Sequence, residues 1–391
     1  MILICWVISL DFCLYFLVHF CIKTLKSNKK ILIIIQRSNG DVLFASNLIS
    51  ELYKNFSSPQ IDILVNEDTL QVAQLLKDVN NIHVFSYKKK FEKKWGQEFS
   101  ILKKIFRKYD LSINLTSSDR SVIYAFLASK KSISSIEQNN KKSWWKKILL
   151  DKYYHFDFKK HIFINNLKPL NLLDIKYRKV QDEIEARPKT IKKMKEILEK
   201  KGIRDFMLFH PSAQYSYKVY SESQRNDLLK NLSKLGKPIL VTGGNSKIDS
   251  QIKKTLPSFP NIFDFIGETS LEDYFALSFL SDAYIGMDTL NMHIAASQNK
   301  RIFAIFGPTI LSIWSPWSNK LELCATNNMP VQTYDNITIF QALMPCVACG
   351  KAGCNDNHGR SECLDNISPK IVFEEVKNWH FSDKLPILNL D

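Results

Sequence analysis

The sequence predicts an α/β protein made of two halves, each built around a parallel sheet. Short apolar runs rich in β-branched residues alternate with amphipathic stretches from residue 31 onward, lapse between about residues 143 and 190, and then resume. When strands alternate with helices along the chain, each helix forms a crossover connection between two strands. The strands of each sheet are therefore expected to run parallel. With 391 residues, of which 45% are hydrophobic and 24% charged, the chain is long enough to bury two cores.

The N-terminal half is predicted over residues 31–180. Its strands are expected where β-branched residues run together, at residues 31–35, 61–65, 83–86 and 111–115. Its helices are expected where apolar residues recur at helical spacing, at residues 41–56, 69–79 and 91–109.

The C-terminal half is predicted over residues 190–380, after a linker near residues 178–190. Its strands are expected at residues 206–210, 238–242, 262–265, 283–286 and 301–306. Its helices are expected near residues 191–201, 221–234, 247–256, 271–280 and 292–297. A cleft between two such halves is the default place for a ligand.

Residues 1–30 form a separate segment. Residues 2–22 are almost all apolar, interrupted by Asp11 and His19, and lysines come next at Lys23, Lys26, Lys29 and Lys30. About 20 apolar residues can span a bilayer, and trailing lysines keep the rest of the chain cytoplasmic. The segment has no small-residue cleavage site at its end, so a removable signal peptide is not expected. The alternatives are a membrane anchor or membrane-associated segment, and a misassigned start or flexible leader.

The eight cysteines fall into an N-terminal and a C-terminal group. Their irregular spacing and the isolated Cys324 indicate a reducing compartment rather than a secreted disulfide scaffold. Four thiols lie within 18 residues, at Cys346, Cys349, Cys354 and Cys363. Because the paired C-x2-C spacing occurs only once among them, a structural zinc site, a disulfide and free thiols all stay open.

The loop after the first predicted strand carries polar residues to the carboxyl end of its sheet. Gly40 permits a tight turn there, and Asp41 either caps the next helix or points a carboxylate toward a ligand. Neither a GxGxxG nor a GxxxxGK[ST] pattern occurs, so simple dinucleotide and P-loop sites are not predicted.

Loops of the C-terminal half supply candidates for anion binding. Lys218, in the loop after His210, would meet a diphosphate as a point charge or would remain solvated. Gly243 and Gly244 allow a ligand to approach closely or merely turn the chain.

A predicted helix begins after Asp288 and Thr289, and its unpaired N–H groups suit a phosphate. His293 lies one helical turn past Thr289, where it faces the same pocket or serves as a structural histidine.

The order of these motifs resembles that of glycosyltransferase family 9, the ADP-heptose:lipopolysaccharide heptosyltransferases. The shared features are Gly40-Asp41, His210-Pro211 with Lys218 downstream, Gly243-Gly244, the D-T-x-x-M-H run at residues 288–293, and the F-G-P-T run at residues 306–309. The resemblance covers residues 31–380 and is more specific in the C-terminal half.

The resemblance implies a GT-B fold, with two Rossmann-like domains facing a central cleft and an inverting transfer that needs no cofactor. The N-terminal domain would bind the acceptor and the C-terminal domain the nucleotide sugar. Asp41 matches the family's proposed base, which removes the acceptor hydroxyl proton during attack on the anomeric carbon. The acceptor loop would comprise Arg37, Ser38, Asn39 and Gly40. Donor residues would be Lys218, Gly243, Gly244, Asp288, Thr289, His293, Gly307, Pro308 and Thr309.

Four positions at three sites depart from the family pattern. Ser212 and Leu290 replace glycines, and Tyr220-Ser221 replaces a Trp-Pro pair. A leucine does not readily adopt a positive φ and brings bulk close to the sugar or phosphates. These departures favour an altered donor choice or reduced activity over a change of fold.

The predicted function is therefore transfer of heptose from ADP-heptose to the lipopolysaccharide inner core, at the cytoplasmic face of the inner membrane. The net charge of +15 and the basic, aromatic stretches at residues 88–95 and 141–147 suit an anionic membrane surface, although solvated helix faces also have this composition. No recognised nucleic-acid module accompanies them, so nucleic acid is not an expected partner. The alternatives are a transferase that uses another nucleotide sugar, and a noncatalytic nucleotide-sugar or glycolipid-binding protein.

Overall fold

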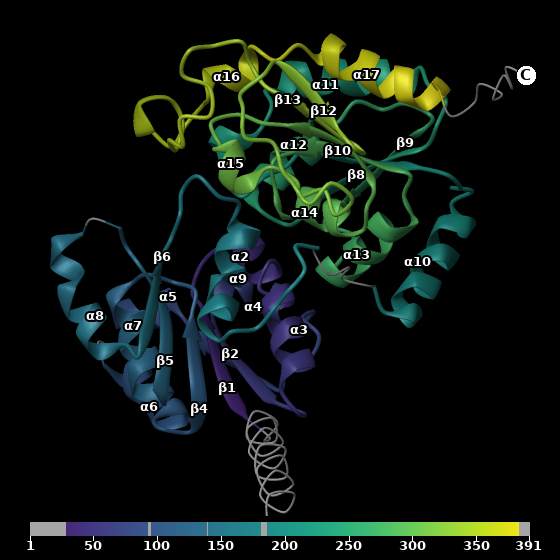
Figure 1. Ribbon diagram of the computed structural model, residues 1–391. Helices are drawn as coiled ribbons and strands as arrows, with labels where there is room; N and C mark the ends of the chain where they lie inside the picture. The colour runs from purple at the N-terminus through teal and green to yellow at the C-terminus, as the bar shows by residue number, and fades with distance from the viewer. Residues whose placement is uncertain (1–28, 93–94, 139, 181–185, 383–391) are drawn as a thin grey trace, which may run out of the picture. The chain divides into compact units, whose positions relative to one another are not determined.

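A computed structural model describes residues 29–92, 95–138, 140–180 and 186–382 (Figure 1). The apolar run predicted at residues 2–22 lies outside the described residues. Among those described, no helix is both long and apolar enough to cross a membrane. The chain divides into two compact units: unit 1 consists of Met1–Asp157 and Ile162–Arg178, and unit 2 consists of Phe158–His161 and Lys179–Asp391.

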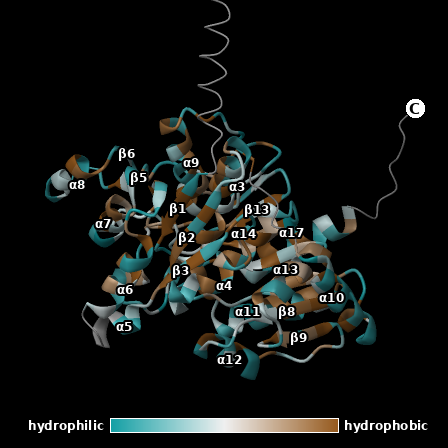
Figure 2. Cartoon of the chain, turned by 90° about the horizontal axis from the view of Figure 1, so that it is seen from below, coloured by the Kyte–Doolittle hydropathy of each residue, from teal (hydrophilic) through white to brown (hydrophobic). Residues whose placement is uncertain are grey.

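Unit 1 contains a six-stranded parallel sheet in the order β3-β2-β1-β4-β5-β6. The strands are β1 (Lys30–Ile35), β2 (Gln60–Asn66), β3 (Asn81–Phe85), β4 (Tyr109–Asn114), β5 (Ser129–Ile136) and β6 (Lys152–His155). The first four were predicted, and β5 and β6 were not. In Figure 2 the strands β1 and β2 are mostly brown, as expected for strands covered on both faces.

The helices of unit 1 are shorter than predicted. They are α2 (Asn39–Leu43), α3 (Ser46–Asn55), α4 (Leu70–Ala73), α5 (Tyr87–Glu92), α6 (Gly96–Ile105), α7 (Asp119–Ala128), α8 (Trp144–Leu149) and α9 (Ile162–Leu172). The single helix predicted at 41–56 is divided into α2 and α3, and the one predicted at 91–109 ends before β4. Ile101 and Ile105 of α6 and Tyr124 of α7 pack with Leu32 and Ile34 of β1 in one core cluster.

Unit 2 contains a seven-stranded sheet in the order β12-β13-β11-β10-β7-β8-β9. The strands are β7 (Met207–His210), β8 (Ile239–Gly243), β9 (Ile262–Ile266), β10 (Ala283–Met287), β11 (Arg301–Ile305), β12 (Val331–Tyr334) and β13 (Ile337–Phe340). All pairs are parallel except β12 with β13, which are antiparallel at the sheet edge. The first five strands agree with the predicted ranges within one or two residues.

The helices of unit 2 are α10 (Pro188–Lys200), α11 (Glu222–Ser233), α12 (Lys247–Lys254), α13 (Leu271–Leu280), α14 (Leu290–Ser297), α15 (Leu311–Trp314), α16 (Glu362–Asp365) and α17 (Pro369–Ser382). Capping boxes begin α12, through Ser246 and Asp249, and α13, through Ser270 and Asp273. Each box satisfies N–H groups that a helix start would otherwise leave without partners, so these boundaries are fixed locally.

Candidate functional site

The order of the strands identifies, in each sheet, a position at the carboxyl ends of the strands where ligands commonly bind. In unit 1 the order reverses between β1 and β4, and in unit 2 it reverses between β7 and β10. Crossovers leave on opposite faces at such a point, so a crevice opens outside the carboxyl ends of the two strands. Asp41 follows β1, His210 ends β7, and Asp288 follows β10.

In unit 2, two predicted donor residues meet in an ion pair. The ammonium of Lys218 lies 2.9 Å from the Asp288 carboxylate. The Asp288 side chain is 6% exposed, whereas that of Lys218 is 26% exposed. The carboxylate therefore holds the ammonium in one direction while part of the lysine side chain remains accessible.

Thr289 is the N-cap residue of α14, and its side chain makes no capping hydrogen bond. The first turn of this eight-residue helix therefore keeps its N–H groups free of a side-chain cap, as a phosphate site requires. His293, one turn further, is buried, and burial together with the positive charge of Lys218 lowers its pKa to about 4, although Asp288 acts in the opposite direction. A neutral imidazole at pH 7 offers hydrogen bonds rather than charge.

A second polar group lies at the carboxyl ends of β7 and β8, and the sequence indicated its histidine but not the partners of that histidine. His210 Nδ1 lies 3.0 Å from Thr242 Oγ1 and 3.3 Å from the Asn291 side-chain nitrogen. Burial lowers the pKa of His210 to about 4. The residues involved are about 30 and 80 positions apart, so no local motif marks the group.

The glycines predicted to contact a donor differ in their surroundings. An added Cβ at Gly243 would lie 2.8 Å from the Asp249 carboxylate, and one at Gly244 would lie 3.3 Å from it. At Gly307 an added Cβ would lie 2.9 Å from the Leu364 side chain. Gly243 and Gly244 therefore leave room for the Asp249 carboxylate beside the loop after β8. Gly307 instead permits close packing against Leu364 of α16.

The loop around Gly307 is also held by backbone bonding. Pro308 accepts a hydrogen bond from the Gly350 N–H at 2.7 Å, and Thr309 is buried with 7% exposure. This loop is therefore ordered by contacts within unit 2.

The three departures from the family pattern have local explanations. The Tyr220 hydroxyl donates to the Ile367 carbonyl at 2.8 Å, and Ser212 bonds to the Asp249 carboxylate, which helps to lower the pKa of that acid. Leu290 begins α14 and has no positive φ. Leu290 therefore avoids the backbone strain that a positive φ would impose, and the effect of its bulk on the donor stays a prediction.

In unit 1, Asp41 is fixed by its neighbours. Its Oδ2 accepts hydrogen bonds from Ser38 Oγ at 2.6 Å and Ser38 N at 3.2 Å, and its Oδ1 lies 2.9 Å from Arg37 Nε. The Arg37 guanidinium in turn lies over the ring of Phe156, 5.1 Å from its centroid. The predicted helix-capping role of Asp41 is thus present, and the carboxylate is held in a single orientation.

Asn39 and Gly40 lie inside α2 rather than in an open loop. Gly40 has no positive φ, so the predicted tight turn at this glycine is wrong. Asn166, from α9, places its side-chain amide 3.5 Å from the Asp41 carbonyl.

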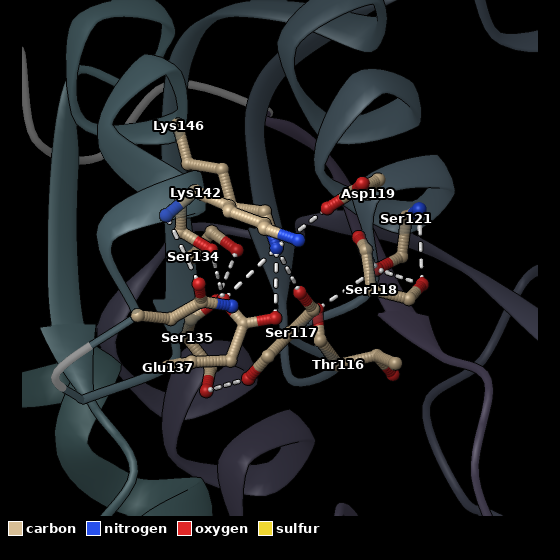
Figure 3. Close-up of polar contacts among 12 residues, drawn as sticks. Thr116, Ser117, Ser118, Asp119, Ser121, Ser134, Ser135, Glu137, Lys142 and Lys146 are labelled. Carbon is tan, nitrogen blue, oxygen red and sulfur yellow. Dashed lines mark hydrogen bonds and ion pairs between the residues drawn. The ribbon is translucent and has the colours of Figure 1, made fainter.

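An ion cluster around a buried lysine lies beyond the carboxyl ends of β4 and β5 (Figure 3). Lys146 is fully buried, and its ammonium lies 2.9 Å from Glu137 and 2.8 Å from Asp119. It also donates to the Ser117 carbonyl at 2.6 Å. The sequence placed Lys146 in a basic stretch suited to a membrane surface, and this is wrong for Lys146 because it joins α8 to the ends of the strands.

The C-terminal cysteines are free thiols, and within the described part of the chain no group of three or more metal-binding side chains is close enough to hold an ion. Cys346 and Cys349 are exposed, and Cys363 is buried. Burial raises the pKa of Cys363 to about 11, with further contributions from Cys349, Cys354 and Cys346. The structure thus has four free thiols here, and a structural zinc site at these cysteines stays a prediction.

His161 is a further buried group of unit 2 that the sequence did not indicate. Its Nε2 lies 2.8 Å from the Ser315 carbonyl, and its ring lies 5.4 Å from that of Trp317. Burial lowers the pKa of His161 to about 3, with a smaller contribution from repulsion by His293 when that imidazole is protonated.

Comparison with known proteins identifies the family. Residues 99–342 match the family described as glycosyltransferase family 9 (heptosyltransferase). The chain belongs to glycosyltransferase family 9. It is therefore a glycosyltransferase, and the predicted class of enzyme is confirmed.

Curated relatives carry the same activity in their names. The chain is 25% identical over 294 residues to lipopolysaccharide heptosyltransferase 3 of Escherichia coli, covering 73% of this chain and 85% of the relative. It is 24% identical over 306 residues to lipooligosaccharide heptosyltransferase 2 of Haemophilus influenzae, with the same coverage. These matches support heptose transfer as the activity of this family member.

Solved structures show the same fold. The E. coli ADP-heptose lipopolysaccharide heptosyltransferase II matches with a TM-score of 0.68 at 17% identity, over 91% of this chain and all of that chain. The E. coli heptosyltransferase WaaC with ADP-2-deoxy-2-fluoro heptose matches with a TM-score of 0.64 at 14% identity, over 89% and 99% of the two chains. The predicted GT-B fold is confirmed.

Proposed function

We propose that this enzyme transfers heptose from ADP-heptose to a sugar hydroxyl of the lipopolysaccharide core, with inversion at the anomeric carbon. The observation that carries the proposal is the Lys218–Asp288 pair beside the start of α14, at the reversal point of the unit 2 sheet. The names of the curated relatives support both the sugar and the acceptor class.

In the proposed donor site, the Lys218 ammonium and the first N–H groups of α14 bind the diphosphate. Asp288 orients the lysine, and the neutral imidazole of His293 supplies a hydrogen bond. Negative charge grows on the departing diphosphate as its bond to the sugar breaks, so cations and N–H groups fixed at that position lower the barrier. Thr289 and the loops at Gly243, Gly244 and residues 307–309 complete the donor site.

In the proposed reaction, Asp41 accepts the proton of the acceptor hydroxyl. The hydroxyl oxygen forms a bond to the anomeric carbon, and ADP leaves with the electron pair of the broken C–O bond. Arg37 and Ser38 hold the carboxylate in one orientation, as a general base requires. We assign the acceptor loop to Arg37–Gly40 because it adjoins this carboxylate in sequence.

Donor profiling tests the proposed reaction. Purified enzyme is incubated with a heptose-terminated truncated core acceptor and, separately, ADP-heptose, ADP-glucose, UDP-glucose or GDP-mannose, and products are measured by mass spectrometry. The proposal predicts a product of one added heptose with ADP-heptose and much slower transfer from the others. Efficient transfer from a UDP- or GDP-sugar alone would favour a transferase of different donor specificity, and donor binding without transfer to any acceptor would favour a noncatalytic binding protein.

We also propose that α8 contacts the anionic cytoplasmic face of the inner membrane. Trp144 and Ile148 are 64% and 71% exposed, and they lie one helical turn apart beside Lys147. Exposed tryptophan with adjacent lysines is typical of segments that lie at a lipid interface. Lys146, on the buried side, fixes the direction in which the exposed residues point.

Vesicle sedimentation tests the membrane contact. The double variant Trp144→Ala/Ile148→Ala should bind vesicles of phosphatidylcholine with phosphatidylglycerol several-fold more weakly than the wild type. Leu343→Ala, at a residue 85% exposed in unit 2, is the matched control and should bind like the wild type. Equal binding by all three proteins would exclude α8 as the contact.

A structural zinc ion at Cys346, Cys349, Cys354 and Cys363 stays a prediction that needs these thiols to move closer together. Elemental analysis of the purified protein decides it: one zinc per chain, lost in Cys349→Ser, would support the site. The proposed reaction has no step that involves this metal.

A further inference from the structure

A row of polar residues ends the central strands of unit 1. Ile35 of β1 pairs with Val65 of β2, so Gln36, one residue further, lies beside Asn66. In a parallel sheet such neighbours point to the same face and their strands are about 4.8 Å apart. On the other side, the Gln36 N–H donates to Thr116 Oγ1 at 3.0 Å, which fixes the backbone of Gln36 at the reversal point.

Both carboxamides are buried and incompletely hydrogen-bonded. Gln36 is 5% exposed and Asn66 is 6% exposed. Across the part of the chain that the structure describes, Gln36 Oε1 and Nε2 and Asn66 Oδ1 have no hydrogen-bond partner. A buried amide without a partner is destabilising because it loses its hydrogen bonds to water, and native proteins satisfy nearly all such groups. Three unsatisfied amide atoms on neighbouring residues therefore point to a ligand.

The described part of unit 1 contains other buried polar atoms that lack hydrogen-bond partners. Phe85 pairs with Asn66 across β2 and β3, and the guanidinium of Arg120 lies 3.7 Å from the centroid of the Phe85 ring. Arg120 Nε and Tyr124 Oη, one helical turn apart on α7, and Glu98 Oε2 lack hydrogen-bond partners among the described residues. Arg120 therefore lies near this end of the sheet through its contact with Phe85, whereas Tyr124 belongs to the apolar core cluster.

Gln36 and Asn66 also adjoin the carboxylate proposed as the base. Asn66 Nδ2 lies 3.5 Å from the Arg37 carbonyl, and the Arg37 side chain forms the ion pair with Asp41. A ligand held by the two carboxamides therefore lies close to the segment that carries Asp41.

We propose that Gln36 and Asn66 bind hydroxyl groups of the sugar acceptor and so contribute to acceptor specificity. A carboxamide has both donors and acceptors, as a sugar hydroxyl does, so two neighbouring carboxamides match two neighbouring hydroxyls. Because the two carboxamides are uncharged, the groups that these two side chains recognise are hydroxyls rather than a phosphate. This inference rests on the proposed function, because that function supplies the sugar acceptor whose hydroxyls the carboxamides would bind.

Isosteric substitution tests the inference. Gln36→Met and Asn66→Leu keep the side-chain volume and remove the hydrogen bonds. Each should weaken binding of a deacylated, heptose-terminated core oligosaccharide about tenfold by calorimetry, because one or two neutral hydrogen bonds are lost. KM for the acceptor should rise by a similar factor, while kcat and KM for ADP-heptose stay within about twofold.

Gln97→Met is the matched control, because the Gln97 carboxamide is already satisfied. It accepts from Ser86 N at 2.6 Å and donates to Ser86 O at 2.9 Å. This variant should have a lower Tm and normal acceptor binding, whereas Gln36→Met should keep or raise its Tm. Gln36→Met and Asn66→Leu with wild-type acceptor affinity would overturn the inference.

Binding and transfer separate this inference from the proposed function. If the wild type binds the oligosaccharide but transfers no heptose to it, the proposed reaction fails, and the variants still decide the role of the carboxamides. If the wild type does not bind the oligosaccharide, the inference itself is overturned.

Discussion

Two lysines, each near the carboxyl ends of the strands in its own unit, differ in how many charged partners they contact. Lys146 of unit 1 is fully buried and contacts two carboxylates, Glu137 and Asp119 (Figure 3). Lys218 of unit 2 is partly exposed and contacts one, Asp288. An ammonium with several partners has its hydrogen bonds committed to the fold, whereas one with a single partner keeps donors for a ligand. Whether a lysine near a site can bind a ligand therefore depends on how many of its donors are already bonded within the fold.

The charged groups at the carboxyl ends of the two sheets also differ in sign, which indicates different roles for the two units. Unit 1 presents a fixed carboxylate, Asp41, and unit 2 presents a cation, Lys218. We therefore expect chemistry on the acceptor to depend on unit 1 and donor affinity to depend on unit 2.

Asp41→Asn gives the largest expected effect. The amide cannot accept the proton, so the single-turnover rate of transfer should fall roughly 10³-fold, within the range for loss of a general base. The Kd for ADP, measured by calorimetry, should stay within about twofold. A transfer rate within tenfold of the wild type would exclude Asp41 as the base.

Lys218→Met should chiefly weaken donor binding. Loss of one charge-assisted hydrogen bond costs about 1.5–3 kcal/mol, so the Kd for ADP should rise roughly 10- to 100-fold. Arg225→Lys, at a buried cation whose Nη2 donates to Thr255 Oγ1 at 2.7 Å, is a control for changes to a cation elsewhere in unit 2. Unchanged ADP affinity in Lys218→Met would contradict the proposed donor site.

Lys146→Met should instead reduce stability. Its two carboxylates would lose a buried partner, and because both are partly exposed the expected cost is about 2 kcal/mol, below that of a fully buried pair. Urea unfolding measures this change. The Kd for ADP should not change, and a variant with weak ADP binding but normal stability would break the comparison between the two lysines.

His293→Gln should reduce the dependence of stability on pH. The folded pKa of His293 is about 4, below the unfolded value of about 6.5, so its stabilising contribution is complete above pH 6.5 and declines as the pH falls toward 4. Between pH 7.5 and pH 5.0 the wild type should lose roughly 2 kcal/mol more than the variant. Urea unfolding at the two pH values measures the difference, and equal losses would mean that His293 is not buried in neutral form.

The sequence predicted the elements whose pattern is local. The first five strands of unit 2 are apolar runs flanked by polar loops, and their positions were found closely. Strand β5, with the sequence SKKSISSI, was missed because its serines interrupt the apolar run that marks a buried strand. Their hydroxyls are satisfied by other segments and the backbone: Ser129 donates to Ser112 of β4, and Ser134 donates to the Ser135 carbonyl. The helix at 41–56 was predicted as one because apolar spacing continues across the break between α2 and α3.

The sequence predicted the residues of the candidate site only where those residues lie together in a short motif. Asp288, Thr289 and His293 lie in one short run, whereas the contact of His210 with Thr242 joins two strands. The carboxamide of Gln36 has no motif, and its unsatisfied atoms become evident only when the packing around β1 is known. The solvent-facing position assumed for Lys146 failed for the same reason, since the side chains that surround it come from distant segments.

The assignment of Phe158–His161 to unit 2 restricts how this protein can be dissected. A chain begun at Lys179 would lack His161, so the Ser315 carbonyl would lose its imidazole partner and Trp317 its neighbouring ring. Expression of the C-terminal half alone, a common route to a nucleotide-binding fragment, therefore requires a grafted tetrapeptide or a circularly permuted gene rather than a single cut.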